Sequence, residues 1–508
     1  MAITSNQFIL FLLVLLVVYY LVPKKLQWIV LLIGSYAYYM ISSIPAVLFL
    51  LYSTVITYGA GAWIGRIYEK AEDRKAAKKT TQKIMLAAII LDIGMLAYLK
   101  YTNFILENLN NLFHAHFSML ELLLPLGISY YTFQTVGYVL DVYWGRTEPS
   151  KNPFQYALFV AFFPQLVQGP IGRYGTLAPQ LCAAHPFSIS RIKFGLERIL
   201  WGIFKKMLIA EWAAVYRDAI FKDPDKYPGI AIFGVILYSI ELYADFSGGI
   251  DVMLGVGNMF GIGMDENFKR PYFSVSLTDF WRRWHITLGS WMKDYVMYPL
   301  TLSKSMNRLG KSAKKVFGKK KGRLIPICIS NLIVFLLVCI WHGPTWNNIG
   351  WGLYNGVIIA FSSFFAGNYE SMKKKLHIND KAKWYRVFMI CRTFAIINIS
   401  WYFDCADSFG TAMKMIRYSF THFDPSQFLQ ISSGKLGTAY TPYALLTMLI
   451  CLAVLILVSV LQERGMHIRE TMARWPLALE LIVCLVVLIA IPLFSPMAAA
   501  RGFIYAQF

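Results

Sequence analysis

Two histidines stand in motifs that combine an ionisable ring with hydrophobic neighbours. His285 ends the motif Phe280-Trp281-Arg282-Arg283-Trp284-His285, and His342 lies within Trp341-His342-Gly343. Histidine is the side chain whose ordinary pKa, about 6.5, allows it to accept and return a proton near neutral pH. A general base that activates a hydroxyl group needs this property. The motifs therefore predict an acid–base site, with His342 as the candidate base and His285 as a second catalytic residue.

Each motif also has a purely structural interpretation. His342 could form no more than a hydrogen bond at a helix end, and the residues up to His285 suit a membrane interface, where Trp lies at headgroup level and Arg extends towards water. The residues after His342 favour a functional role, because Gly343-Pro344 breaks a helix. Irregular backbone at membrane depth is tolerated only beside protein or a water-filled cavity.

The same motifs supply candidates for substrate binding. The planar guanidinium group of Arg282 or Arg283 suits an anionic donor, and Trp281 and Trp341 are the aromatic residues beside them. No metal is expected, because the seven cysteines contain no Cys-x-x-Cys pair and are scattered through apolar runs.

The chain ends on an aromatic peptide, residues 503–508, which follows the last apolar run. One interpretation is an aromatic anchor at the membrane interface. The other is that the phenol oxygen of Tyr505 carries an acyl group, since a phenolate is a good leaving group in covalent catalysis. Tyr505 is therefore the third candidate catalytic residue, and both interpretations stay open.

Composition places these motifs in a membrane protein. Apolar residues make up 57% and charged residues 15% of the 508 positions, and the mean hydropathy is +0.49, whereas soluble domains have about 45–50% and about 25%. A net charge of +21 could indicate nucleic-acid binding. The Lys and Arg residues, however, fall in short segments between apolar runs, which is the pattern of cytoplasmic loops, so no nucleic-acid partner is expected.

Thirteen apolar runs are long enough to span or nearly span a bilayer. They lie at about residues 7–22, 26–42, 44–65, 84–100, 119–140, 154–170, 194–215, 228–248, 324–341, 347–366, 387–403, 441–461 and 476–494. We predict an all-α polytopic membrane protein with about 11–13 membrane segments. Some of them are expected to be broken or re-entrant, especially near Pro164, Pro170 and the glycines after Phe246.

Basic segments set the expected orientation. Lys and Arg are concentrated at 66–83, 311–323, 373–386 and 464–474, and each of these segments is expected to face the cytoplasm. The segment 311–323, with seven basic residues in thirteen positions, is expected to be a loop. His342 then lies towards the outer half of the membrane, and both chain termini lie outside. The connection at about 404–440 also faces outside and is expected to contain a short surface helix from Ser408 to Tyr418.

Taken together, these motifs resemble the membrane-bound O-acyltransferase family, and within it the alginate O-acetyltransferase branch. Further stretches that carry the resemblance are Pro125–Gln134, Phe162–Leu166, Gln168–Ile171, Asp245–Gly248 and Glu266–Tyr272. The resemblance covers about residues 1–405 and implies a bundle of helices around a funnel or tunnel through the membrane. It also implies that His342 is the essential histidine and that His285 lies on the cytoplasmic side.

Three residues of the shared stretches are further candidates for substrate binding: Gln168, Asn267 and Asp245. The carboxylates of Asp245 and Asp251 surround glycines, and could bend the backbone at a cavity or orient a histidine. We favour a structural role for Asp251 and leave that of Asp245 open. Members of the branch often have an arginine at the position of Cys405, so this chain lacks the guanidinium group that would bind an anion or dock a partner there.

The tail resembles the C-terminal aromatic peptide of the small single-pass protein in teichoic-acid D-alanylation. In that pathway the tyrosine is understood to carry the acyl group between the membrane acyltransferase and an extracellular transferase. By this resemblance, residues 476–508 form a membrane helix with an extracytoplasmic tail. Residues 406–475 supply the outer connection, an additional helix and a cytoplasmic basic loop.

The hypothesis is an O-acyltransferase of the plasma membrane with no bound cofactor. An acyl group, acetyl in the first place, passes from a cytoplasmic thioester, acetyl-CoA or an acyl carrier, past His285. His342 activates Tyr505, and the tyrosyl ester passes the group to a serine of an extracytoplasmic SGNH/GDSL-like partner, which acylates a cell-surface polymer. The alternatives are D-alanyl transfer from a carrier protein, direct acylation of a lipid or polymer hydroxyl, and a non-enzymatic transporter with the histidines as a proton relay.

Overall fold

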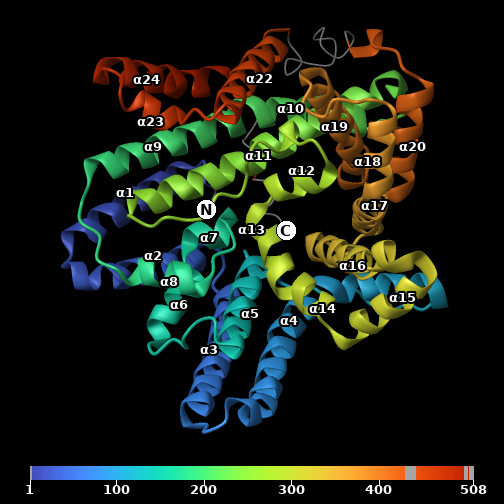
Figure 1. Cartoon of the computed structure of the whole chain (residues 1–508). Helices are drawn as coiled ribbons and strands as arrows, with labels where there is room; N and C mark the ends of the chain where they lie inside the picture. The colour runs from blue at the N-terminus through green and yellow to red at the C-terminus, as the bar shows by residue number, and fades with distance from the viewer. Residues whose placement is uncertain (1–2, 429–441, 497–501, 503–508) are drawn as a thin grey trace.

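The structure is a computed structural model that describes residues 3–428, 442–496 and 502 (Figure 1). Within these residues the chain forms helices and no β-strand, apart from an isolated bridge between Phe268 and Trp284. The predicted all-α class is therefore confirmed.

Seven helices of the described ranges are long and apolar enough to cross a membrane. They are α3 (Ala46–Lys70), α4 (Arg74–Phe113), α11 (Ala231–Met259), α16 (Ile325–His342), α19 (Lys383–Cys405), α22 (Pro442–Glu463) and α24 (Leu477–Phe494). An eighth is added if α17 (Trp346–Phe364) and α18 (Ala366–Lys375), which meet at 59°, count as one bent span. The chain is a multi-pass membrane protein.

Several of the other predicted segments are divided into shorter helices, as expected near the prolines. The run 154–170 forms α6 (Pro153–Ala161) and α7 (Phe163–Gln168), which are separated at Phe162. Pro164 is tolerated because it occupies the first turn of α7, where an N–H group would have no partner within the helix.

The run 194–215 contains α9 (Ile189–Phe204), the π-helical segment η2 (Lys205–Ala210) and α10 (Glu211–Phe221). The run 119–140 becomes helical only at α5 (Ile128–Trp144), after Gly127, whose φ of +70° lies in the left-handed region that glycine adopts readily.

Two predictions about local structure are corrected. The basic segment 311–323 is not a loop but most of α15 (Lys304–Gly322), which begins where the hydroxyl of Ser303 accepts a hydrogen bond from the backbone N–H of Met306. Lysine favours helix, so a high charge alone does not predict a loop. The glycines after Phe246 do not break the backbone either, because α11 continues to Met259.

The connection after α19 contains the expected short helix, α20 (Phe409–Thr421), with Ser408 as its N-cap. Its location outside the cytoplasm stays a prediction. The other α-helices are short or partly apolar: α1 (Asn6–Leu21), α2 (Gln27–Ser42), α8 (Tyr174–Cys182), α12 (Leu277–Arg283), α13 (Ile286–Met292), α14 (Tyr298–Thr301) and α23 (Ile468–Met472). Short 3₁₀ or π turns are η1 (Lys24–Leu26), η3 (Pro228–Ile230), η4 (Pro271–Phe273) and η5 (Lys293–Met297).

Helix α11 lies at the centre of the molecule (Figure 1) and packs against α9, α10, η2, α19, α20 and α7. Glycines allow its closest approach to α9. A Cβ atom added to Gly202 would lie 2.5 Å from the carbonyl oxygen of Gly248, and one added to Gly248 would lie 2.8 Å from that of Gly202. Small residues at such crossings let helix backbones pack closely in membranes.

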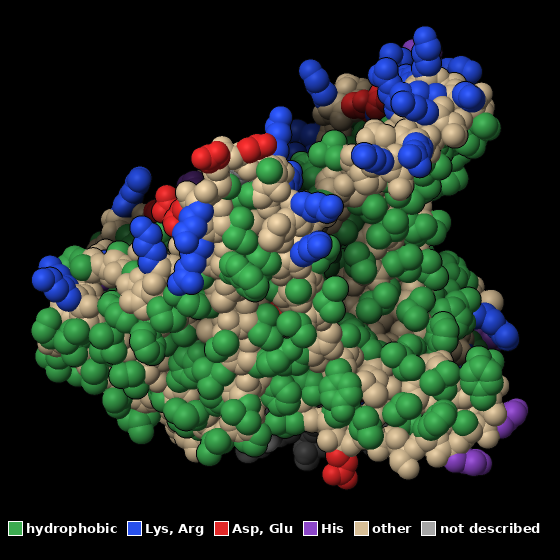
Figure 2. Space-filling model, turned by 90° about the horizontal axis from the view of Figure 1, so that it is seen from below, with side chains coloured by type: hydrophobic (Ala, Val, Ile, Leu, Met, Phe, Trp, Pro, Cys, Tyr) green, Lys and Arg blue, Asp and Glu red, His purple; other side chains and the backbone are tan. Residues whose placement is uncertain are grey.

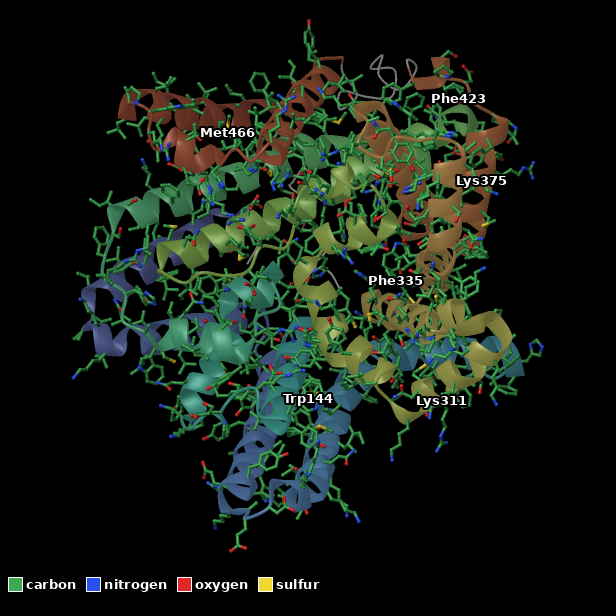
Figure 3. All side chains as sticks on the ribbon, viewed as in Figure 1. Trp144, Lys311, Phe335, Lys375, Phe423 and Met466 are labelled. Carbon is green, nitrogen blue, oxygen red and sulfur yellow. The ribbon has the colours of Figure 1, made fainter. Side chains whose placement is uncertain are left out.

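The surface divides into a basic rim and an apolar band. Figure 2 shows Lys and Arg side chains along the upper rim of that view and on a projection at its upper right, above a broad area of hydrophobic side chains. Two of the basic residues, Lys311 of α15 and Lys375 of α18, are exposed at the margin of the molecule (Figure 3). This separation fits a bilayer around the apolar band, with one strongly cationic side.

Candidate active site

His285 lies in a tightly bonded turn between α12 and α13. Its φ of 46° is left-handed, and two segments of the chain pair on either side of it. The backbone N–H of Lys269 donates to the carbonyl of Arg283 at 2.9 Å, and that of Ile286 donates to the carbonyl of Asn267 at 3.0 Å. This pairing fixes the backbone that carries the imidazole.

Asn267 connects this turn to the His285 ring. Its Oδ1 atom accepts hydrogen bonds from the backbone N–H and the hydroxyl of Thr287, both at 3.0 Å, and lies 3.3 Å from Nδ1 of His285. Because the backbone N–H of Thr287 can only donate, it identifies the accepting atom as the oxygen of the Asn267 amide. Nδ1 of His285 then carries the proton, and Nε2 carries the lone pair that general-base chemistry requires.

His342 ends α16, and its ring lies between two tryptophans. The ring centroids of Trp341 and Trp351 are 5.0 Å and 5.4 Å from that of His342. Trp341 also lies 6.0 Å from the ring of His285. The fold therefore brings His285 into contact with Trp341, the residue that precedes His342, although the basic helix α15 lies between the two motifs in the sequence. Trp281, another predicted substrate-binding residue, contacts Trp351 at 5.3 Å.

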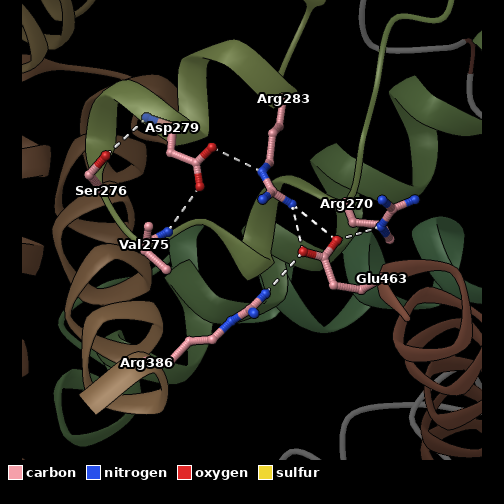
Figure 4. A network of polar contacts seen from close by, with 7 residues as sticks. All are labelled: Arg270, Val275, Ser276, Asp279, Arg283, Arg386 and Glu463. Atoms are coloured by element: carbon pink, nitrogen blue, oxygen red, sulfur yellow. Dashed lines mark hydrogen bonds and ion pairs between the residues drawn. The ribbon is translucent and has the colours of Figure 1, made fainter. Parts of the chain in front are cut away.

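The arginines of the first motif differ in their surroundings. Arg283 donates to Asp279 at 3.1 Å and to the carboxylate of Glu463 at 3.1 Å, at the end of α22 (Figure 4). Glu463 also accepts from Arg270 at 2.7 Å and from Arg386 at 3.3 Å. Arg283 thus joins α12 to α22, and Glu463 extends the network to α19 through Arg386. Arg282, by contrast, is exposed. A role of either arginine in donor binding stays a prediction.

Asp245 is buried in α11, and its carboxylate lies 2.6 Å from Nζ of Lys206 in η2, which also pairs with Glu211 at 2.8 Å. Its neighbour Phe246 lies 5.0 Å from the ring of His285. Asp245 therefore precedes, in the sequence, a residue that contacts His285. Asp251 pairs with Lys205 at 2.6 Å and with Arg198 at 2.8 Å, which fits the structural role expected for it.

Gln168, at the end of α7, is fully buried, and neither polar atom of its side chain has a hydrogen-bond partner among the residues that the structure describes. A Cβ atom added to Gly249 of α11 would collide with this amide, so the two lie in close contact. The side-chain nitrogen of Asn267 is also buried without a partner. Buried unpaired amides of this kind are rare in structural roles. The N–H groups of Asn267 and Gln168 can donate hydrogen bonds to oxygens of a ligand, and the side-chain oxygen of Gln168 can accept one.

The site also includes a residue that the motifs did not indicate. Nζ of Lys100 in α4 donates to the carbonyl of Trp341 at 2.5 Å and lies 5.9 Å from the centroid of the Trp341 ring. The signal was present in the sequence, because Lys100 ends the apolar run 84–100. An ionisable residue within a membrane segment is a functional candidate in its own right.

Tyr505 lies outside the described residues, but the chain before it is placed at two points. The indole N–H of Trp212 donates to the carbonyl of Phe494 at 2.8 Å. Nζ of Lys206 donates to the carbonyl of Gly502 at 3.4 Å. Gly502 is therefore in contact with Lys206, the partner of Asp245.

No group of three or more His, Cys, Asp or Glu side chains in the described part of the chain is arranged to hold a metal ion. The chemistry available at the site is that of two imidazoles among tryptophans, with buried amides and a lysine nearby. The imidazoles can transfer protons, and the amides and the lysine can form hydrogen bonds with the polar groups of a substrate. The tunnel that would connect the site to both sides of the membrane stays a prediction.

Comparisons with known proteins identify the family. Residues 150–313 match the model of the membrane-bound O-acyltransferase family. The probable alginate O-acetylase AlgI of Pseudomonas syringae pv. tomato is 32% identical over 429 residues, which cover 84% of this chain and 76% of the relative.

Two other relatives differ in their named products. The peptidoglycan O-acetyltransferase of Helicobacter pylori is 29% identical over 76% of this chain and 75% of its own length. The teichoic acid D-alanyltransferase of Bacillus subtilis is 29% identical over 54% of this chain and 67% of its own length.

Proposed function

The chain belongs to the membrane-bound O-acyltransferase family and is an O-acyltransferase, and from this premise we propose that it acetylates a cell-surface polysaccharide with an acetyl group taken from a cytoplasmic thioester. The observation that carries the proposal is the position of both motif histidines against Trp341, at 5.0 Å and 6.0 Å between ring centroids. The names of the relatives with the widest coverage, which concern alginate and peptidoglycan O-acetylation, support acetyl as the group and a polysaccharide as the acceptor.

The basic side of the molecule receives the donor. No Asp or Glu occurs between Asp294 and Glu370, a range that includes the whole of α15. A surface of this kind attracts the phosphates of acetyl-CoA or an acidic acyl carrier protein. The thioester end then passes His285, with Trp281, Arg282 or Arg283 on the donor side and the buried amides of Gln168 and Asn267 along its path.

His342 is the general base. It takes the proton of the phenol of Tyr505 while the phenol oxygen attacks the thioester carbonyl. The tetrahedral intermediate collapses with cleavage of the carbon–sulfur bond, and the leaving thiolate takes the proton back from the imidazole. A phenol with a pKa of about 10 is a poor nucleophile at neutral pH, so the step requires a positioned base.

The position of Gly502 supports Tyr505 as the relay. Three residues of extended chain reach at most about 11 Å, and Gly502 contacts Lys206, whose partner Asp245 adjoins Phe246 at the His285 ring. Both chain termini lie outside the cytoplasm in this proposal. The tyrosyl ester then passes its acetyl group to the serine of an extracytoplasmic SGNH/GDSL-like partner, and neither donor nor polymer crosses the bilayer.

A second candidate is D-alanyl transfer from a carrier protein. The teichoic acid D-alanyltransferase of Bacillus subtilis, which is 29% identical to this chain over 54% of its length, favours it. Both candidates use the same histidines and the same tail. They differ in the acyl group that is transferred, acetyl or D-alanyl, and in the donor that carries it. Direct transfer to a polymer hydroxyl would leave Tyr505 without a chemical role.

The test is intact mass spectrometry of the C-terminal peptide after incubation of the full chain with acetyl-CoA. Wild-type protein is expected to gain one acetyl group on Tyr505, and His342→Ala and Tyr505→Phe are expected to gain none. Thiol release that depends on His342 without an adduct on Tyr505 would keep the acyltransferase and exclude the relay. Neither signal with acetyl-CoA, but an adduct with a D-alanyl carrier protein, would select the second candidate.

A further inference from the structure

Two consecutive residues of α4 hold the end of the helix that carries His342. Nζ of Lys100 donates to the carbonyl of Trp341 at 2.5 Å, and the hydroxyl of Tyr101 donates to the carbonyl of Ile340 at 2.9 Å. Both carbonyls belong to the last turn of α16, where the carbonyl groups of a helix lack partners within the helix. A neighbouring helix therefore provides the C-terminal cap that α16 itself cannot form.

The Trp341 side chain is fixed from the same direction. Its indole N–H donates to the carbonyl of Ser129 in α5 at 3.4 Å. Nζ of Lys100 lies 3.4 Å from the hydroxyl of Ser129 and 5.9 Å from the centre of the Trp341 ring. Backbone, ring and indole N–H of Trp341 are thus all held by Lys100 and Ser129.

The charged ammonium group of Lys100 is unfavourable in a membrane segment, and its contacts offset this free-energy penalty. The penalty arises because an ammonium group within a membrane segment loses its contacts with water. At this position it faces two oxygens, an aromatic face and the C-terminus of α16, whose partial negative charge favours a cation. A Leu or Met would fill the space without the cost, so capping alone is a weak reason for a lysine at this position.

We propose that Lys100 is a positioning residue for His342: its ammonium group fixes the carbonyl and ring of Trp341, and thereby the place of the imidazole that follows in the chain. The inference rests on the proposed function, because it assumes that His342 is the base. Misplacement of a catalytic group by about 1 Å can reduce turnover about a hundredfold. The effect is expected in kcat, since Lys100 acts through His342 and not on the donor.

The experiment measures the first release of free thiol from acetyl-CoA, one per Tyr505, by the purified full chain in lipid nanodiscs. Here kcat is the maximal rate constant of that release, and KM is the acetyl-CoA concentration at half of it. Lys100→Met is expected to lower kcat by about ten- to a hundredfold and to leave KM within about twofold. Lys100→Arg keeps a cationic donor and is expected to recover most of the loss. Tyr101→Phe removes only the cap on Ile340, one residue further from His342, and is expected to have a smaller effect than Lys100→Met.

Lys193→Met is the matched control. Lys193 also connects two helices, through an ion pair with Glu480 of α24 at 2.8 Å. Its removal is expected to leave kcat unchanged. If Lys100→Met does not fold, Lys100→Gln replaces it, because the shorter amide is polar but does not reach as far as the ammonium group.

The possible outcomes separate the inference from the proposed function. A wild-type kcat in Lys100→Met or Lys100→Gln overturns the inference, as does an equal loss of kcat in Lys193→Met. A rise of KM with an unchanged kcat overturns it as well, because it would assign Lys100 to donor binding. If the wild-type chain releases no thiol from any thioester, the proposed function itself fails first.

Discussion

Nδ1 of His285 lies 3.3 Å from Oδ1 of Asn267, and the same oxygen holds both the backbone N–H and the hydroxyl of Thr287 at 3.0 Å. One amide oxygen therefore orients the imidazole and closes the turn that carries it. We expect Asn267→Ala to leave two buried donors of Thr287 unpaired and to cost about 1–3 kcal/mol of stability each.

Turnover of Asn267→Ala should fall more than its stability explains, because the proton on Nδ1 of His285 is no longer fixed. Thermal unfolding and thiol release at a temperature where the variant is folded measure the two effects separately. Thr287→Val serves as the control. It removes the hydroxyl, which donates to Asn267 and accepts from the backbone N–H of Ile171 at 3.1 Å, and it keeps the contact between Asn267 and His285. Equal turnover of both variants would assign Asn267 a structural role only.

Gly249 leaves the space that the side chain of Gln168 occupies. Because a Cβ atom at this position would collide with the amide of Gln168, we expect Gly249→Ala to displace the amide and to reduce acetyl transfer. Gly94→Ala in α4 is the matched control, because a Cβ atom there has no neighbour within 4 Å. It should be neutral or slightly stabilising, since alanine favours helix. Kinetics of both variants with acetyl-CoA compare them directly, and full activity of Gly249→Ala would argue against a role for Gln168.

Arg217 and Glu241 form a bidentate ion pair between α10 and α11, with distances of 2.9 Å and 2.7 Å. Removal of one partner of a buried pair typically costs about 3–5 kcal/mol, whereas replacement of both by apolar residues is often neutral. Arg217 also pairs with Asp218 at 2.8 Å, and Asp218 has a second partner in Lys222 at 3.5 Å. We expect Arg217→Met to lower the thermal midpoint strongly, and the double variant Arg217→Met/Glu241→Leu to recover the part of the loss that comes from the buried Glu241 carboxylate. A double variant as unstable as the single one would show that the charges themselves are required.

A surface ion pair gives a pH dependence whose sign follows from its contacts. Hydrogen bonds from Lys414 and from the hydroxyl of Tyr418, at 2.6 Å and 2.7 Å, lower the pKa of Asp225 below its ordinary value. A carboxyl group with a lowered pKa in the folded state stabilises that state above its unfolded pKa of about 3.9. This stabilisation is lost as the pH falls through the folded pKa.

The difference in thermal midpoint between wild type and Asp225→Asn should therefore be constant from about pH 5 to pH 8 and shrink below about pH 4. Thermal unfolding followed by tryptophan fluorescence at several pH values provides the measurement. Thr411→Val at the start of α20, whose hydroxyl lies 2.9 Å from that of Ser408 and contacts no titratable group among the described residues, should show no such pH dependence. A difference that grows with acidity would contradict the predicted sign.

Much of the architecture followed from local patterns in the chain. The apolar runs identified α16, α19, α22 and α24 with nearly correct ends, because a span of hydrophobic residues must be helical in a membrane. Ser408 marked the start of α20, since serine at an N-cap satisfies a backbone N–H of the first turn. These features depend on neighbours along the sequence only.

Other features could not be read from local patterns. The sequence of α15 is rich in lysine and was predicted as a loop, yet it forms a helix. The glycines near Gly248 were expected to break α11, yet they serve its close contact with α9. For α11 the deciding partner, Gly202 of α9, lies far away in the sequence, whereas for α15 the helix propensity of lysine outweighs the charge that indicates a loop.

The sequence by itself determined that this is a polytopic helical membrane protein, which residues are able to exchange protons, and, through its motifs, the family. Only the tertiary structure decided that the ring of Trp341 lies beside that of His285, that Arg283 is engaged by Glu463, and that Lys100 holds the end of α16. The physical reason is that residue type and periodicity encode burial and helix, whereas the contacts of a catalytic side chain depend on how helices that are distant in the sequence cross.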